Sequence, residues 1–311
     1  MSAKVFLTVT IDTECDKGAR WRVKRPLAFE GVTRGVTLHL QPLFRAHRAK
    51  ATYLLSPEVM RHEPSVAALR AVEAEAELGT HLHGELAEPG AFEPDETKAF
   101  QRDYPEEVER DKLVYLTRVF RDAFGRAPRS FRAGRFGVGP ATLGILEDLG
   151  YTVESSVTPF MDWAPNGAPG LAFLDAPTQP YHPDRRDPGR RGSSPLWEVP
   201  VTILPHPLGA VPLLGGRLEP RWLRPTRGSE RGIVAVAADA IARARAEAPT
   251  RPVVLTCMFH NVEILPGTSP YAETEGQALA ILRRPRALLS FAEREGIAVI
   301  GLADVPGVLE A

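Results

Sequence analysis

Strand-like and helix-like segments alternate along almost the whole of this 311-residue chain, and this alternation constrains its fold more than any other feature. Short runs rich in β-branched and apolar residues are separated by longer segments with helical periodicity. The expected strands lie at 5–12, 51–56, 77–83, 129–134, 151–156, 196–204, 252–260 and 297–302. The expected helices lie at 36–49, 65–76, 106–125, 140–150, 229–248 and 285–296. Such alternation is typical of α/β proteins, in which parallel strands are covered by helices.

Seven or eight expected strands in one continuous series favour a closed or nearly closed α/β barrel over an open, doubly wound sheet. The sequence contains no internal repeat and no linker, so we expect a single domain over residues 1–311. The alternation is interrupted at 158–195, where Pro, Gly and charged residues are frequent. This composition predicts a long loop excursion on the surface.

The composition argues against several classes of protein. The chain is 43% hydrophobic and 25% charged, and its formal net charge is −1, whereas a general nucleic-acid or acidic-membrane binder would carry a basic excess. The first residues resemble a strand rather than a signal peptide, and no run approaches the roughly 18 apolar residues of a membrane span. We therefore expect a cytoplasmic protein without nucleic-acid or membrane partners, and the oligomeric state stays open.

Polar residues gather where four of the expected strands end. These ends read Asp12-Thr13-Glu14, His81-Leu82-His83, Phe131-Arg132 and Phe259-His260-Asn261. Active sites of parallel α/β barrels form at the carboxyl ends of their strands. A polar residue at one strand end could be accidental, but four such ends indicate a common site.

The spacing of these residues indicates their chemistry. Every second side chain of an extended chain points to the same face, so Asp12 can act together with Glu14, and His81 with His83. A carboxylate at a strand end is often only a turn or capping residue, and an isolated histidine is usually structural. Two imidazoles on one face, however, can bind a single divalent cation and leave a position open for water.

Together these stretches resemble the polysaccharide deacetylase family, the NodB-homology or carbohydrate esterase 4 group, and in particular its intracellular-type members with a degenerate first motif. LTVTIDTE resembles the first motif of the family, ELGTHLH its histidine motif, FRAGRFG its arginine motif, LWEVPVT its fourth motif and MFHNVE its last histidine motif. ATYLL and GYTVESSV resemble two further strands of the family. The order and spacing of these matches, over residues 5–265, are more specific than any one of them.

The resemblance implies a distorted (β/α)7–8 barrel of the polysaccharide deacetylase type. It also implies a hydrolase that uses a divalent metal, commonly Zn²⁺, to cleave a non-peptide carbon–nitrogen bond, with an acetylated sugar, a polysaccharide or a small amide as substrate. By position, Asp12 matches the catalytic base and Arg132 the arginine that orients this base. His260 matches the catalytic acid, and His81 matches a metal ligand.

Two departures from the family pattern affect the expected metal ligands. Thr13 occupies the position of the usual metal-binding aspartate. The usual His-x-x-x-His becomes His81-x-His83, with Glu85 where the second histidine would fall. Glu14 could replace the missing aspartate, and either His83 or Glu85 could complete the site. We expect a metal site formed by Glu14, His81 and His83.

Candidate substrate contacts are Trp163, Glu198 and Asn261. The apolar face of a sugar ring can pack against an aromatic side chain such as Trp163. The hydroxyl groups of a sugar can bond to a carboxylate or an amide, as in Glu198 and Asn261. Three alternatives stay open. The first is a metal-free, allantoinase-like amidohydrolase of the same fold. The second is a glycosidase that pairs Asp12 with Glu14 or Glu198. The third is a non-catalytic carbohydrate-binding barrel.

Overall fold

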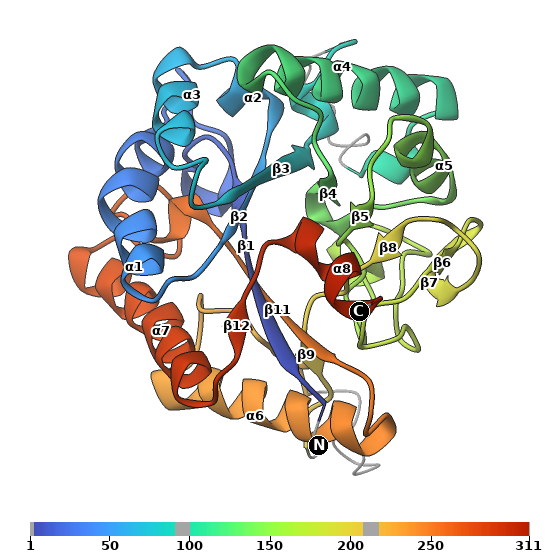
Figure 1. Cartoon of the computed structure of the whole chain (residues 1–311). Helices are drawn as coiled ribbons and strands as arrows, with labels where there is room; N and C mark the ends of the chain where they lie inside the picture. The colour runs from blue at the N-terminus through green and yellow to red at the C-terminus, as the bar shows by residue number, and fades with distance from the viewer. Residues whose placement is uncertain (1–2, 91–99, 208–217, 311) are drawn as a thin grey trace.

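The computed structural model of the protein describes residues 3–90, 100–207 and 218–310. Its centre is a curled sheet surrounded by helices (Figure 1). The strands of this sheet are β1 (Val5–Thr13), β2 (Thr52–Leu55), β3 (Glu77–Leu82), β4 (Ser130–Ala133), β5 (Val153–Glu154), β8 (Trp197–Glu198), β11 (Val253–His260) and β12 (Ala298–Val299). They lie in the order β11-β1-β2-β3-β4-β5-β8, β12 pairs with β1, and every pairing is parallel. The expected distorted (β/α)7–8 barrel is confirmed.

The barrel is distorted between β8 and β11, where no strand ladder joins its edges within the described ranges. Pro200 has no N–H to donate, and β8 ends two residues before it. The gap is bridged instead by the N–H of Thr202, which donates to the carbonyl of Thr256 at 3.0 Å, and by the side chain of Gln179, which accepts from the N–H of Val254 at 2.9 Å. The single strand expected at 196–204 is therefore wrong. The segment forms β8 and then β9 (Ile203–Leu204), which pairs antiparallel with β10 (Arg221–Trp222).

The outer helical layer comprises η2 (Gly31–Leu40), α1 (Gln41–Ala46), α2 (Pro57–Met60), α3 (Glu63–Arg70), α4 (Glu106–Phe124), α5 (Pro140–Asp148), α6 (Glu230–Glu247), α7 (Glu275–Arg294) and α8 (Val305–Leu309). The expected helix at 285–296 is wrong at its start, because α7 begins ten residues earlier. Thr274 caps it by accepting from the N–H of Gln277, and Pro285 lies inside the helix rather than in its first turn. Among the described helices, none has both the length and the apolar character that crossing a membrane requires.

Side chains of β1 alternate between two environments. Leu7, Val9 and Ile11 are buried in the main hydrophobic core, which the surrounding helices complete. The intervening Thr10 and Asp12 are also buried but point to the opposite face, where both accept hydrogen bonds from Arg132. The interior of the barrel is thus polar toward the carboxyl end of β1.

The excursion at 158–195 contains a short antiparallel hairpin of β6 (Pro183–Asp184) and β7 (Asp187–Arg191). Arg185 of this hairpin pairs with Glu147 of α5 at 2.6 Å. Elsewhere in the excursion, Leu171 and Phe173 are buried in the main core. The excursion is consequently anchored to the barrel by both apolar and charged contacts.

Candidate active site

The strand register brings the polar strand ends together. Asp12 on β1 is paired directly with His260 on β11, and His81 on β3 is paired directly with Arg132 on β4. Paired residues of neighbouring strands project their side chains to the same face of a sheet. All four side chains therefore reach the interior of the barrel at its carboxyl end.

A compact group of possible metal ligands lies at this end. Glu14 Oε1 is 3.1 Å from His81 Nε2 and 3.0 Å from His83 Nε2, and the ligand atoms of the three buried residues all lie within 4.8 Å of one another. Two imidazole nitrogens and a carboxylate oxygen are a common donor set for zinc. These residues fit the divalent cation expected from the sequence. Thr13 takes no part in the group, because its hydroxyl donates to the carbonyl of Ile11 at 2.9 Å.

The outer nitrogens of both histidines are held by partners. His81 Nδ1 is 3.0 Å from the carbonyl of Arg132, and a hydrogen bond from Nδ1–H to this carbonyl would leave Nε2 available to a cation. His83 Nδ1 is 3.3 Å from Glu85 Oε1, which also accepts from Arg135 at 2.8 Å. Burial lowers the pKa of His83, but Glu14 and Glu85 together raise it to about 9. Of the two alternatives left open by the sequence, His83 lies in the ligand group and Glu85 lies behind it.

Asp12 is held by a fully buried guanidinium. Arg132 donates to Asp12 Oδ1 at 2.7 Å, to Thr10 Oγ1 at 2.9 Å and to the carbonyl of Ser155 at 2.7 Å. Burial alone would raise the pKa of Asp12, but Arg132, followed by His81 and His260, holds it below its usual value. Asp12 is consequently an ionised and oriented carboxylate.

His260 faces the same space. Its ring contacts the carboxylate of Glu263, which the sequence analysis did not identify as a site residue. Its Nε2 lies 3.9 Å from Asp12 Oδ2 and 3.7 Å from Glu14 Oε1. Its Nδ1 lies 2.8 Å from Glu263 Oε1, which also accepts from Arg224 at 2.7 Å. Burial raises the pKa of Glu263, but Arg224 and His260 lower it to about 2. The spacing of three residues in HNVE was the available signal, because a carboxylate that close can reach back to the imidazole.

Lys17 is the second functional residue missed from the sequence. Its ammonium lies 2.6 Å from Glu14 Oε2, and only 3% of its side chain is exposed. Burial would raise the pKa of Glu14, but Lys17 and His83 hold it well below its usual value. The signal was again a spacing of three residues, in ECDK.

A cavity of about 260 Å³ opens over these groups. Asp12, Glu14, His81, His83 and His260 line it together with Trp163, Trp21, Phe136, Arg224 and Tyr271, among others. Trp163 thus lies where the sequence places a substrate contact. Arg224 and Tyr271 also line a neighbouring cavity of about 510 Å³.

Glu198 and Asn261, the other two candidate substrate contacts, are not among the described residues that line this cavity. Asn261 is fully buried: its side-chain oxygen accepts from the N–H of Glu14 at 2.8 Å, and its side-chain nitrogen donates to the carbonyl of Glu14 at 3.0 Å. It therefore fixes the backbone that carries Glu14. Glu198 is also fully buried and accepts from the N–H of Val157 at 3.1 Å.

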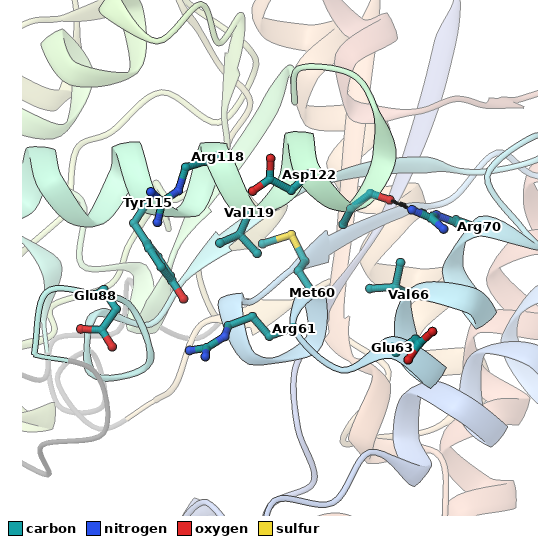
Figure 2. Close-up of a pocket in the computed structure, with 11 residues that line it drawn as sticks. Met60, Arg61, Glu63, Val66, Arg70, Glu88, Tyr115, Arg118, Val119 and Asp122 are labelled. Atoms are coloured by element: carbon teal, nitrogen blue, oxygen red, sulfur yellow. Dashed lines mark hydrogen bonds between the residues drawn. The ribbon is translucent and has the colours of Figure 1, made fainter.

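A larger hollow lies elsewhere, on the outer surface beside α2, α3 and α4 (Figure 2). It measures about 740 Å³, and acidic and basic side chains surround apolar ones such as Met60 and Val119. Its Arg70 donates to the carbonyl of Ala123 at 2.9 Å. None of the polar strand ends reaches this hollow, so we place the candidate active site in the smaller cavity.

Solved structures share this architecture, whereas no protein-family model and no curated protein matches the sequence. A protein assigned as a glycoside hydrolase/deacetylase from Parabacteroides distasonis aligns over 99% of this chain and 71% of its own, with a TM-score of 0.65 and 11% identity. A protein assigned as a polysaccharide deacetylase from Pseudomonas aeruginosa aligns over 99% of this chain and 89% of its own, with a TM-score of 0.56 and 14% identity. The chain has the polysaccharide deacetylase fold. The allantoinase Puue has a similar barrel, with a TM-score of 0.57 and 14% identity over 98% of this chain and 89% of its own.

Proposed function

We propose that this protein is a metal-assisted hydrolase of a non-peptide carbon–nitrogen bond, and that it removes the N-acetyl group from an acetylated sugar or polysaccharide. One observation carries the proposal. The ligand group of Glu14, His81 and His83 lies in the same small cavity as an ionised carboxylate, Asp12, and an imidazole, His260. Amide hydrolysis requires a base for the attacking water and an acid for the departing amine, and this arrangement supports a role for Asp12 as the base and His260 as the acid.

A divalent cation held by Glu14, His81 and His83 would polarise the amide carbonyl and increase the acidity of water. Asp12 would accept the proton of the attacking water, because its neighbours keep it ionised at neutral pH. Arg132 leaves Asp12 Oδ2 directed toward the cavity by holding Oδ1 at 2.7 Å. The buried guanidinium thereby orients the base as well as stabilising its charge.

His260 would donate a proton to the departing amine, which leaves too slowly as an anion. Its Nε2 faces the cavity while its Nδ1 is tied to Glu263 at 2.8 Å. The carboxylate of Glu263 would accept a hydrogen bond from Nδ1–H and so set the orientation of the ring. Trp21 contacts the same ring edge-on, with ring centroids 4.8 Å apart, and limits its movement further.

The surroundings of the cavity support a carbohydrate substrate. Trp163 and Phe136 lie on its wall, with ring centroids 5.3 Å apart, and offer apolar surface to a sugar ring. A substrate longer than one sugar has room in the neighbouring cavity, which shares Arg224 and Tyr271. Direct contact of Glu198 or Asn261 with substrate remains a prediction from the sequence, as does a cytoplasmic location, which fractionation of cells would test.

The test is an assay of the purified protein on N-acetylated chitooligosaccharides, with acetate and reducing ends measured separately. We expect acetate and free amine in equal amounts without new reducing ends. Activity should be lost after removal of metal by a chelator and restored by Zn²⁺, Co²⁺, Ni²⁺ or Mn²⁺. Reducing ends without acetate would identify a glycosidase. Binding of the sugar without any product would favour the non-catalytic alternative.

A second candidate function is a metal-free amidohydrolase that acts on small ureides. The ion pair between Lys17 and Glu14 favours it, because a protein ammonium already supplies positive charge beside the ligand group. The same fold in the allantoinase Puue makes allantoin a suitable probe. Hydrolysis of allantoin that persists in the chelated protein would support this function over the first.

A further inference from the structure

Lys17 is buried next to the residue that the proposed metal site depends on. Its Nζ lies 2.6 Å from Glu14 Oε2 and 3.9 Å from Cys15 Sγ, and 3% of its side chain is exposed. Burying an ammonium is costly unless an opposite charge compensates for it. Lys17 therefore cannot be regarded as an ordinary surface lysine. Its ammonium forms a buried ion pair with Glu14.

The two oxygens of Glu14 have different partners. Oε1 faces His81 Nε2 and His83 Nε2 at 3.1 and 3.0 Å, whereas Oε2 faces only the ammonium of Lys17 among the contacts found for the described residues. A cation bound between the histidines would therefore meet one oxygen of the carboxylate. Lys17 would offset part of the negative charge that attracts this cation, although its ammonium also interacts with the buried acid Glu58, and the ammonium would itself repel a divalent ion.

The neighbouring carboxylate does not compensate for this loss of charge. Asp12, the other acid that lines the cavity among the described residues, is paired with the buried guanidinium of Arg132 at 2.7 Å. Both acids that line the cavity close to the histidines are thus paired with protein cations. This arrangement differs from a site built for the tightest possible cation binding, in which ligand carboxylates keep their charge for the metal.

On the basis of the proposed metal site, we propose that Lys17 is a positioning residue that holds Glu14 to ligation through one oxygen and weakens the site for divalent cations. Removal of its charge should then tighten cation binding. A carboxylate left without its partner ammonium attracts a cation more strongly and has both oxygens free to bind it. We expect the dissociation constant for Co²⁺ to fall about tenfold or more in a variant without the ammonium, because the repulsion between two nearby positive charges is removed.

The experiment is a titration of metal-free protein with Co²⁺ in competition with a chelating dye, followed also by the visible absorption of Co²⁺. The variants are Lys17→Met, which removes the charge, Lys17→Gln, which keeps a hydrogen-bond donor for Oε2, and Lys17→Arg, which keeps the charge. Lys50→Met is the matched control, because Lys50 forms an exposed ion pair with Asp304 outside the cavity. Lys17→Met and Lys17→Gln should bind Co²⁺ more tightly than wild type, whereas Lys17→Arg and Lys50→Met should bind it as wild type does.

The outcomes separate this inference from the proposed function. If wild type binds Co²⁺ and deacetylates sugars, but neither Lys17→Met nor Lys17→Gln binds Co²⁺ more tightly, the role of Lys17 is overturned and the hydrolase stands. If no protein binds Co²⁺, the metal site and the role of Lys17 both fail. Binding by the Met or Gln variant alone would support the inference in its strongest form. Where Lys17→Met does not fold, as judged by circular dichroism, Lys17→Gln provides the measurement.

Discussion

Two pairs of buried carboxyl groups lie in this barrel and have opposite surroundings. Asp12 and Glu14 end the first strand and line the cavity, and each is paired with a protein cation. Glu154 and Glu198 are register partners on β5 and β8, and both are fully buried. Each acid of the first pair has its own cation partner, whereas the two acids of the second pair lie next to each other.

The difference is visible in the pKa shifts of Asp12, Glu14 and Glu198. The pKa of Asp12 and that of Glu14 are both below their usual values, because cations outweigh the effect of burial. Burial and the adjacent Glu154 raise the pKa of Glu198 well above its usual value, and Arg132 opposes this without reversing it. Burial next to another acid therefore favours the neutral form of Glu198. A reactive carboxylate in this interior requires its own cation and access to the cavity.

The largest expected effect distinguishes the cavity carboxylates from other buried acids. Asp12→Asn should lower kcat/KM for an N-acetylated sugar by about 10²–10⁴-fold, because the amide cannot accept the proton of water. The matched control is Asp16→Asn, since Asp16 is buried nearby but accepts from the N–H groups of Glu30 and Gly31 at 3.0 and 2.9 Å. Steady-state assays of both variants check this. Equal losses would remove the special role of Asp12.

A smaller effect is expected at Glu263, a third kind of buried carboxylate that acts through a neighbour. Glu263→Gln should lower kcat by about 10–100-fold with little change in KM, because His260 loses the acceptor that orients its ring. Separate measurements of kcat and KM check this. Glu263→Asp should retain more activity than Glu263→Gln, because it keeps the negative charge beside Arg224. A rise in KM alone would instead place Glu263 among substrate-binding groups.

The smallest effect concerns the pair that we regard as structural. Because Glu198 has a raised pKa, the folded state keeps its proton at a pH where the unfolded chain releases it. The stability linked to this proton is full below the unfolded pKa and decreases as pH rises through the folded pKa. Glu198→Gln does not titrate, so its Tm relative to wild type should be about 2–4 °C higher at pH 8 than at pH 5. Thermal unfolding at both values checks this. A constant difference would show that the carboxyl is ionised throughout.

Some local features were readable from the sequence because they depend on short-range patterns. Alternating strands and helices predicted the barrel, and the two-residue spacing of His81 and His83 predicted imidazoles on one face. Other features misled local reasoning. The helix expected over 285–296 begins much earlier, because Thr274 caps α7 ahead of Glu275. Pro200 divided an apparent single strand into β8 and β9 because it cannot donate to a ladder.

The sequence alone determined the fold class and the polar strand ends, since periodicity and residue spacing are properties of the chain itself. Tertiary structure alone decided which charges neutralise one another. Arg132 lies 120 positions from Asp12 and is nevertheless its ion-pair partner at 2.7 Å. Glu263 and Lys17 each lie three residues from the group that they hold, but only burial makes those contacts strong. The physical reason is that electrostatic strength depends on distance and dielectric in the folded interior, which the order of residues does not specify.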